Sequence, residues 1–513
     1  MSKGIIGVIL LGFLLGTSTD AIAFDFRDVV RQAQELAQKP YVAPPKIPGF
    51  LQNLSFEQYQ GIRFNPDKSL WRNNHSLFQV MLISPGLYYK HPVKIDVVDA
   101  GGSHALAFQK SDFNFAEPQL EKRVPPDLGF AGFKLTYPLN SHNTQNQFLV
   151  FAGASYFRGV GKNDSFGLSG RGIAVNTGLP AGEEFPSFIQ YWLIRPNANA
   201  HTMKFYALLD GKSLTGAYRF IVVPGRPTQL KVKAMLFPRD NIALLGLAPL
   251  TSMFFYGQNT PRPTREWRPQ VHDSDGLLIH NGSSGEWLWR PLIDPKQLQM
   301  YYFDTDNVRG FGLLQRQTEF YEYQDLGAHY EARPSAWIVP RGNWGKGKVV
   351  LVELPATNET SDNIVAFWTP TEKVTIGKPI SLTYDLSFGK SNLTGEPGGM
   401  AQATFVGGGN IIGGGQSKGA YRLIVDFSGG SLDRLRANAP VTGAVTAQDG
   451  GTVLENFVEY VEPLHRWRLS ILAKPAAGKD LALRAFLKNG DKALTETWNY
   501  DLPLANQFKE GGS

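Results

Sequence analysis

The segment 265–292 combines aromatic, acidic and basic side chains more densely than the rest of the chain, with three of the ten Trp, two His, two Asp, two Glu and three Arg. Aromatic faces pack against the apolar faces of sugar rings, while carboxylates, Arg and amides bond to hydroxyls. This mixture favours carbohydrate binding and makes Trp267, Trp289 and Arg290 candidate substrate contacts. The alternative is that Trp287 and Trp289, two positions apart on a strand, point to the same side and belong to the core.

A second segment, 358–368, begins as a polar loop that contains acids and continues as an apolar, aromatic strand. A carboxyl at such a border is partly desolvated, which raises its pKa and allows it to act as a general acid near neutral pH. Asp362 and Glu359 are the candidates. The alternative is that these carboxylates only cap the turn before the strand.

Between these segments, Tyr330, Arg333 and Trp337 stand close together in the sequence. Tyr330 and Arg333 have the side chains to line the same groove as the acids, and we include Trp337 among the candidate substrate contacts. The alternative for Tyr330 and Arg333 is a surface turn at Pro334.

Other kinds of site find little support. His272-Asp273 lacks a clear third metal ligand, because the next histidine, His280, is eight positions away. The chain has no G-x-S-x-G motif for a serine hydrolase. Its lack of cysteine excludes thiol nucleophiles, disulfides and zinc-thiolate sites. We predict no metal and no cofactor.

The overall charge argues against a nucleic-acid partner. A net charge of +6 over 513 residues is dilute, and no run of five or more Lys or Arg occurs. Phosphate recognition needs clustered cations.

The first 23 residues have the pattern of a signal peptide. Lys3 precedes an apolar run at 5–15, and Ala21-Ile22-Ala23 matches an A-x-A cleavage site. We predict cleavage after Ala23 by the general secretory route, since no twin-arginine pair is present. A secreted chain without cysteine suits a bacterial periplasm.

The pattern of the remaining chain predicts an all-β structure after two short helices. Asp25 can cap a helix from residue 26, and Ser55 and Gln58 have capping-box spacing. Residues 230–236 alternate apolar and polar, as a half-buried strand should. We expect a large β domain at 24–390, a Gly-rich linker at 391–402 and a small immunoglobulin-like β-sandwich at 403–513.

Several longer stretches resemble the periplasmic glucans biosynthesis proteins G and D, also called the osmoregulated periplasmic glucan proteins. The similarity covers essentially the whole mature chain, and the missing twin-arginine pair favours the G branch. It rests on D-L-G-F-A-G-F at 127–133, G-A-S-Y-F-R at 153–158, G-E-E-F-P at 182–186, A-P-L-T-S-M at 248–253, H-D-S-D-G at 272–276, G-F-G-L-L-Q-R at 310–316, R-P-S at 333–335, W-G-K-G at 344–347 and D-N-I-V at 362–365.

This resemblance implies a mutarotase-like β super-sandwich followed by the immunoglobulin-like domain. It also implies action on the β-1,2-linked glucan backbone in the Gram-negative periplasm, in a family with an inverting β-1,2-glucanase mechanism. By the resemblance, Asp362 matches the general acid and Asp273 the general base. Tyr330 and Glu359 match positions near a proton relay.

Three hypotheses stay open at this point. The first is a glucan-cleaving glycoside hydrolase, favoured because both carboxylates are present. The second is a non-catalytic glucan-binding factor that guides the polymer from a membrane glucan synthase. The third is a glucosyl transferase that uses the same groove. A twofold homodimer is a further open alternative for assembly.

Overall fold

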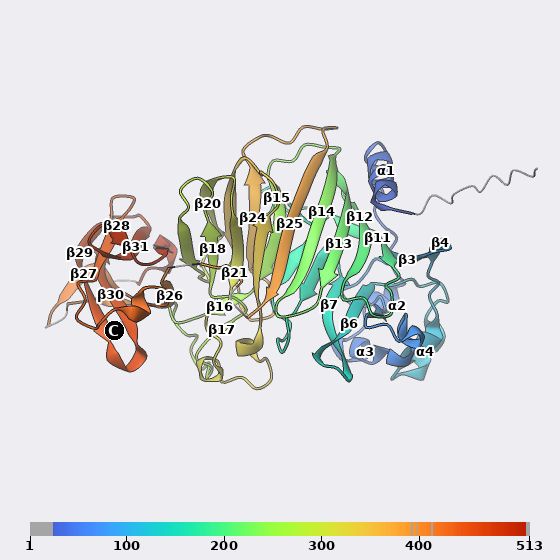
Figure 1. Ribbon diagram of the computed structural model, residues 1–513, viewed down its shortest axis with the longest axis horizontal. Coiled ribbons are helices and arrows are strands. Elements are labelled where there is room, and N and C mark those ends of the chain that lie inside the picture. Colours follow the sequence, from blue (N-terminus) through green and yellow to red (C-terminus); the bar gives the residue numbers. More distant parts are fainter. Residues whose placement is uncertain (1–23, 391–392, 397, 412–413, 509–513) are drawn as a thin grey trace, which may run out of the picture.

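The computed structural model describes residues 24–390, 393–396, 398–411 and 414–508, and within them two large β-sheets dominate (Figure 1). The predicted signal peptide lies outside the described residues. Ten strands form the first sheet: β2 (Gln79–Ile83), β6 (Gly132–Ser141), β7 (Thr144–Ala152), β8 (Tyr156–Gly159), β9 (Ser169–Arg171), β15 (Leu245–Ser252), β24 (Ile364–Pro370), β23 (Lys346–Glu353) and β20 (Gln299–Asp306) in spatial order, with β10 (Ile173–Val175) also paired to β15.

The second sheet has fifteen strands and extends into the C-terminal part of the chain. Its spatial order is β28 (Thr442–Ala447), β31 (Leu481–Asn489), β33 (Thr497–Leu502), β19 (Trp287–Pro291), β18 (Gly276–His280), β21 (Gly310–Leu314), β22 (Ser335–Pro340), β25 (Ile380–Gly389), β14 (Thr228–Pro238), β13 (Leu214–Val223), β12 (Met203–Asp210), β11 (Ser187–Ile194), β3 (Lys94–Asp99) and β4 (Gly102–Ala105), with β32 (Lys492–Ala493) paired to β31.

The described chain also contains smaller sheets and short helices. Three further sheets are β26 (Met400–Asn410), β27 (Gln416–Ser428), β30 (Arg466–Lys474) and β29 (Thr452–Val461); β1 (Ile62–Phe64) with β5 (Phe113–Phe115); and β16 (Phe254–Tyr256) with β17 (Val271–His272). The α-helices are α1 (Phe26–Ala37), α2 (Gly49–Gln52), α3 (Phe56–Gln60) and α4 (Pro118–Arg123), and the 3₁₀-helices η4 (Phe320–Glu322) and η5 (Tyr330–Ala332) lie near the candidate site.

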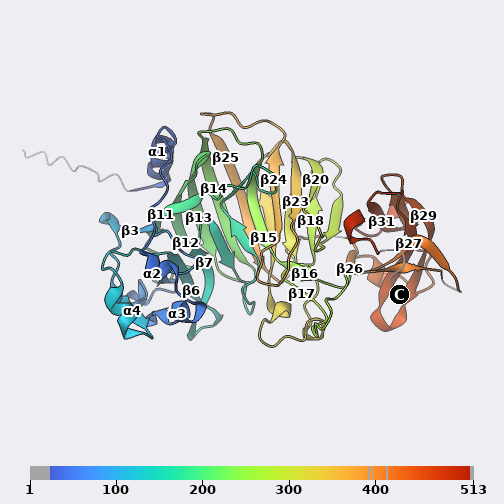
Figure 2. The same cartoon turned by 180° about the vertical axis from the view of Figure 1, so that it is seen from behind.

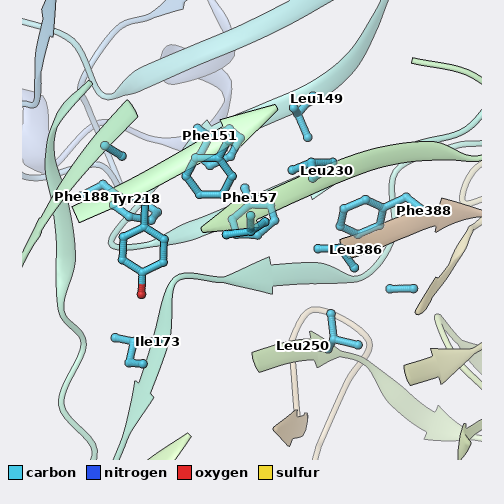
Figure 3. Packing of buried hydrophobic residues seen from close by; sticks show 14 of the residues in the cluster. Leu149, Phe151, Phe157, Ile173, Phe188, Tyr218, Leu230, Leu250, Leu386 and Phe388 are labelled. Carbon is cyan, nitrogen blue, oxygen red and sulfur yellow. The ribbon is translucent and has the colours of Figure 1, made fainter. Parts of the chain in front are cut away.

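The large core is built from aromatic side chains of both sheets. Phe151 of the first sheet meets Phe205 and Phe220 of the second, each with ring centroids 5.1 Å apart in an edge-to-face arrangement. Figure 3 shows Phe151 and Phe157 close together in this cluster. In β14, alternate residues are buried, as the sequence pattern predicts. This packing holds the two sheets as rigid supports for the loops between their strands.

The N-terminal helix α1 follows its predicted signals. Asp25 and Asp28 form a capping box at its start, and Val29 and Ala33 are its buried residues. The Thr215 hydroxyl donates to the Ala33 carbonyl at 2.6 Å, which ties the helix to β13. The helix therefore lies on the large sheet, at the end of the molecule opposite the C-terminal strands (Figures 1 and 2).

The C-terminal strands are joined to the large sheet by backbone pairing. In β19, Leu288 and Trp289 pair in parallel with Thr497 and Trp498 of β33. A second core, which includes Trp289 and Trp498, lies between these strands and the four-stranded sheet. The sheet is therefore continuous across the boundary predicted at residue 390.

The all-β prediction is confirmed. The immunoglobulin-like and mutarotase-like assignments and the domain division stay predictions. Strand β26 begins at Met400, inside the segment expected to be a linker, and residues 391, 392 and 397 lie outside the described residues. Within the part of the chain described, no helix combines the length and apolar character needed to cross a membrane.

Candidate active site

Asp273 directly follows strand β17, and its backbone N–H donates to the Met253 carbonyl at 2.8 Å. Its side chain is only 6% exposed and pairs with the Arg333 guanidinium. Burial raises the pKa of Asp273, Arg333 opposes that rise, and the charge of Asp362 adds to it. The charges of the two candidate carboxyls therefore influence each other, and Arg333, with a smaller effect from Arg158, favours the charged form of Asp273.

Arg333 is fixed by its surroundings as well as by its ion pair. It follows η5, donates to the Ala328 carbonyl at 3.3 Å and lies over the Tyr330 ring at 4.1 Å. Gly167 packs closely on it, because a Cβ added there would lie 3.0 Å from the Arg333 Cβ. Arg333, predicted to contact substrate, is thus placed where it positions Asp273.

Asp362 lies at the end of the loop that leads into β24, and its side chain is 36% exposed. It forms an ion pair with Arg158 of β8, whose Nη2 is 3.3 Å from the Asp362 Oδ2. The Arg158 Nε also donates to the Ser169 hydroxyl at 2.8 Å. Asp362 is consequently open enough for an incoming ligand, unlike Asp273.

Tyr330 and Glu359 meet beside this pair. The Tyr330 hydroxyl donates to the Glu359 Oε2 at 3.1 Å. Burial raises the pKa of Tyr330, so the phenol keeps its proton at neutral pH. Arg268 contacts Glu359 and also reaches Asp325 at 3.1 Å and Glu266 at 2.9 Å. All four candidate catalytic residues therefore converge, with a hydroxyl donor among the carboxylates.

His272 has a packing role. It is completely buried, stacks on Phe254, and its ring nitrogens lie 3.0 Å from Gln315 and 3.2 Å from Gln270. Burial lowers its pKa and favours the neutral imidazole, and Asp275 at 3.5 Å opposes that shift. The described residues contain no group of three or more His, Cys, Asp or Glu side chains that could hold a metal ion.

The candidate substrate contacts are not all brought together. Trp267 is 64% exposed and precedes Arg268, which contacts Glu359. Trp289 and Trp337 are buried in the second core, where the Arg316 guanidinium lies 3.6 Å above the Trp289 ring.

Burial leaves the faces of Trp289 and Trp337 unavailable to a sugar. Trp337 also stacks on Trp287, with ring centroids 5.8 Å apart. Trp289 thus follows the core alternative stated for it, and Trp337, predicted to contact substrate, is buried in the same core. Arg290 is buried under Tyr301, away from the four catalytic candidates.

Residues 24–502 match the family described as periplasmic glucan biosynthesis protein, MdoG. The chain belongs to the MdoG family. It is 44% identical over 488 residues to glucans biosynthesis protein G of Sodalis glossinidius (strain morsitans), covering 94% of this chain and 93% of that protein. It is 43% identical over 496 residues to glucans biosynthesis protein G of Dickeya dadantii (strain 3937), covering 95% and 94%. The predicted resemblance is confirmed, and membership supports a role in periplasmic glucan biosynthesis.

In this MdoG-family chain, one residue that the sequence reasoning missed connects the two loops with the carboxyls. Asn363 accepts from the Phe254 N–H at 2.9 Å, and its Nδ2 donates to the carbonyls of Phe254 and Leu354 at 2.9 and 3.0 Å. Phe254 lies in β16, which pairs with β17 just before Asp273. A 109-residue separation hides this contact from local pattern analysis.

We expect Asn363→Ala to destabilise the MdoG-family protein by roughly 1–3 kcal/mol, because buried backbone groups lose their partners. Urea denaturation measures the change. Asn358→Ala is the matched control, because among the described residues the Asn358 side chain bonds within its exposed loop, to Thr360 and Thr357. Equal stability of the two variants would contradict the bridging role of Asn363.

Proposed function

We propose that this protein is an inverting β-1,2-glucanase that shapes the glucan backbone in the Gram-negative periplasm. The observation that carries the proposal is the placement of two carboxyls, Asp273 paired with Arg333 and Asp362 paired with Arg158, beside the Tyr330–Glu359 hydrogen bond. Family membership supports the glucan as substrate class.

The two carboxyls have surroundings that suit different roles. Asp362 is accessible and is proposed to protonate the oxygen that leaves as the acetal C–O bond breaks. Asp273 is held next to Arg333 and is proposed to accept the proton of the attacking water. Inverting enzymes separate such carboxyls by about 6.5–9.5 Å to leave room for that water.

An attacking water that lies too far from Asp273 for direct proton transfer needs a relay, and the Tyr330 hydroxyl can take part in one. This hydroxyl is held by Glu359. It is proposed to take up a proton from water or a substrate hydroxyl while its own proton passes on toward Asp273. Trp267 is proposed as an exposed platform for a sugar ring. A neutral glucan requires no basic surface, in keeping with the dilute net charge.

The decisive experiment incubates the purified protein with linear β-1,2-glucan and follows the products and their anomeric form by NMR. Inversion at a β-linkage releases the α-anomer first. Uncleaved but bound polymer would instead favour a binding factor that serves a membrane synthase, and rearranged chains would favour a transferase. The β-anomer as first product would refute the inverting mechanism.

We expect Tyr330→Phe to reduce cleavage by about 10²-fold, since general acid–base groups contribute roughly 10²–10⁴-fold. The substitution removes only the hydroxyl and keeps the ring under Arg333. Steady-state kinetics with linear glucan measures kcat. Tyr321→Phe, at an exposed tyrosine of η4, is the control. Unchanged kcat in Tyr330→Phe would remove Tyr330 from the relay.

A further inference from the structure

A cavity of about 480 Å³ lies where the edge strand β20 faces strands β19, β31 and β33. Arg290, Tyr301, Tyr302, Asn499 and Asp501 are among its lining residues, and none of the four candidate catalytic residues lines it. The volume is well above the ~30 Å³ of one water molecule and within the roughly 300–1,000 Å³ of small-molecule sites.

Buried polar atoms without partners in the described structure belong to three residues that line this cavity, Arg290, Tyr301 and Asp501, and to Glu353, which lies near Arg290. Arg290 is 1% exposed, and none of its three guanidinium nitrogens has a hydrogen-bond partner within the described residues. The same holds for the buried Tyr301 hydroxyl and for one carboxylate oxygen each of Asp501 and Glu353. Buried polar groups in folded proteins are normally paired, so this concentration points to a bound ligand.

The charges decide what kind of ligand fits. Arg290 interacts electrostatically with Asp501 and Glu353, yet its guanidinium nitrogens bond to neither acid in the described structure. An anion would be attracted by Arg290 but repelled by the two acids. A cation would be attracted by the acids but repelled by Arg290. A hydroxyl both donates and accepts, so it can connect the guanidinium to a carboxylate.

Aromatic surface adds a second requirement. The Tyr301 ring lies 4.2 Å from the Arg290 guanidinium, and Tyr302 on the next position is 46% exposed at the same cavity. Tyr302 and the amide of Asn499 offer an apolar face and a polar group to one ligand. A ligand with hydroxyls around an apolar ring satisfies both the polar atoms and the aromatic surface.

We infer that this cavity is a second carbohydrate site, which binds a glucosyl unit at the junction of the large sheet and the C-terminal strands. The identity of the sugar as glucose rests on the proposed function. Binding here would hold a glucan chain on the C-terminal side while another part of it is cleaved at Asp273 and Asp362.

The test uses the full-length Asp362→Asn protein, so that substrate is not consumed, and titrates it with the β-1,2-linked glucose disaccharide by calorimetry. We expect two binding events. Asn499→Ala and Tyr302→Ala in that background should weaken one of them at least tenfold, and Arg290→Met should abolish it. Trp267→Ala should weaken only the other.

Tyr88→Ala is the matched control, because Tyr88 is an exposed tyrosine between β2 and β3. Near-ultraviolet circular dichroism checks folding, and if Arg290→Met unfolds, the Asn499 and Tyr302 variants decide. Binding that all three variants leave unchanged overturns the second site. If the wild-type protein fails to cleave glucan while the event sensitive to Asn499 persists, the glucanase proposal fails and the second site stands.

Discussion

Asp362→Asn is expected to lower glucan cleavage by about 10²–10⁴-fold, because it removes the proton that the leaving oxygen needs. Folding should be preserved, since Asp362 is partly exposed and its ion pair with Arg158 is of the kind worth about 0–1 kcal/mol. The asparagine keeps the size of the side chain and an oxygen that can accept from Arg158. Release of reducing ends from linear glucan measures cleavage, and calorimetry measures the retained binding.

Asp67→Asn provides the control for this substitution. Asp67 is an exposed carboxylate paired with Arg72 at 3.0 Å, far in the sequence from the candidate site. Its variant should cleave glucan at the normal rate. Normal turnover by Asp362→Asn would contradict the assignment of Asp362 as the general acid. Loss of both cleavage and folding would show that its role is structural.

Arg333→Met is expected to shift the pH dependence of cleavage to higher pH. Arg333 lowers the pKa of Asp273, and burial raises it. Without Arg333 the pKa of Asp273 rises further, so the carboxyl loses its proton, and the base becomes active, only at a higher pH than in the wild-type protein. A nearby opposite charge is worth about 1–3 pKa units, so kcat/KM on the acidic limb should fall roughly 10–1,000-fold.

The measurement is kcat/KM against pH for linear glucan. Arg341→Met is the matched control, because Arg341 pairs with Asp385 at an exposed position and touches none of the candidate residues. A parallel loss of rate at every pH, with the acidic limb in its wild-type position, would mean that Arg333 does not tune Asp273.

Local sequence pattern predicted the strands better than it predicted their exposed faces. The alternation in β14 and the capping residues of α1 and α3 act over a few positions, so they could be recognised without the fold. A period of two assigns Trp287 and Trp289 to one side but does not say whether that side meets solvent or a second core. Trp289 is buried because it packs into the second core, which is formed with strands about 200 residues later in the chain.

The candidate site depended on contacts that no local pattern contains. Asp362 meets Arg158 across 204 positions, and Asp273 meets Arg333 across 60. Resemblance to the family supplied Asp362 and Asp273 as a pair, whereas Arg158 and Asn363 became apparent only from the folded chain. Arg290 was predicted to bind substrate beside the acids, and its burial places it at the other cavity.

The pairing of β19 with β33 has a consequence for how the protein can be divided. A chain ended near residue 390 would leave the β19 edge without its partner and would uncover Trp289, which the C-terminal strands bury. Unpaired edges with apolar side chains recruit other chains and aggregate. A deletion of the C-terminal part would therefore change solubility as well as function. Single substitutions in β31 or β33 are the better way to measure what that part contributes.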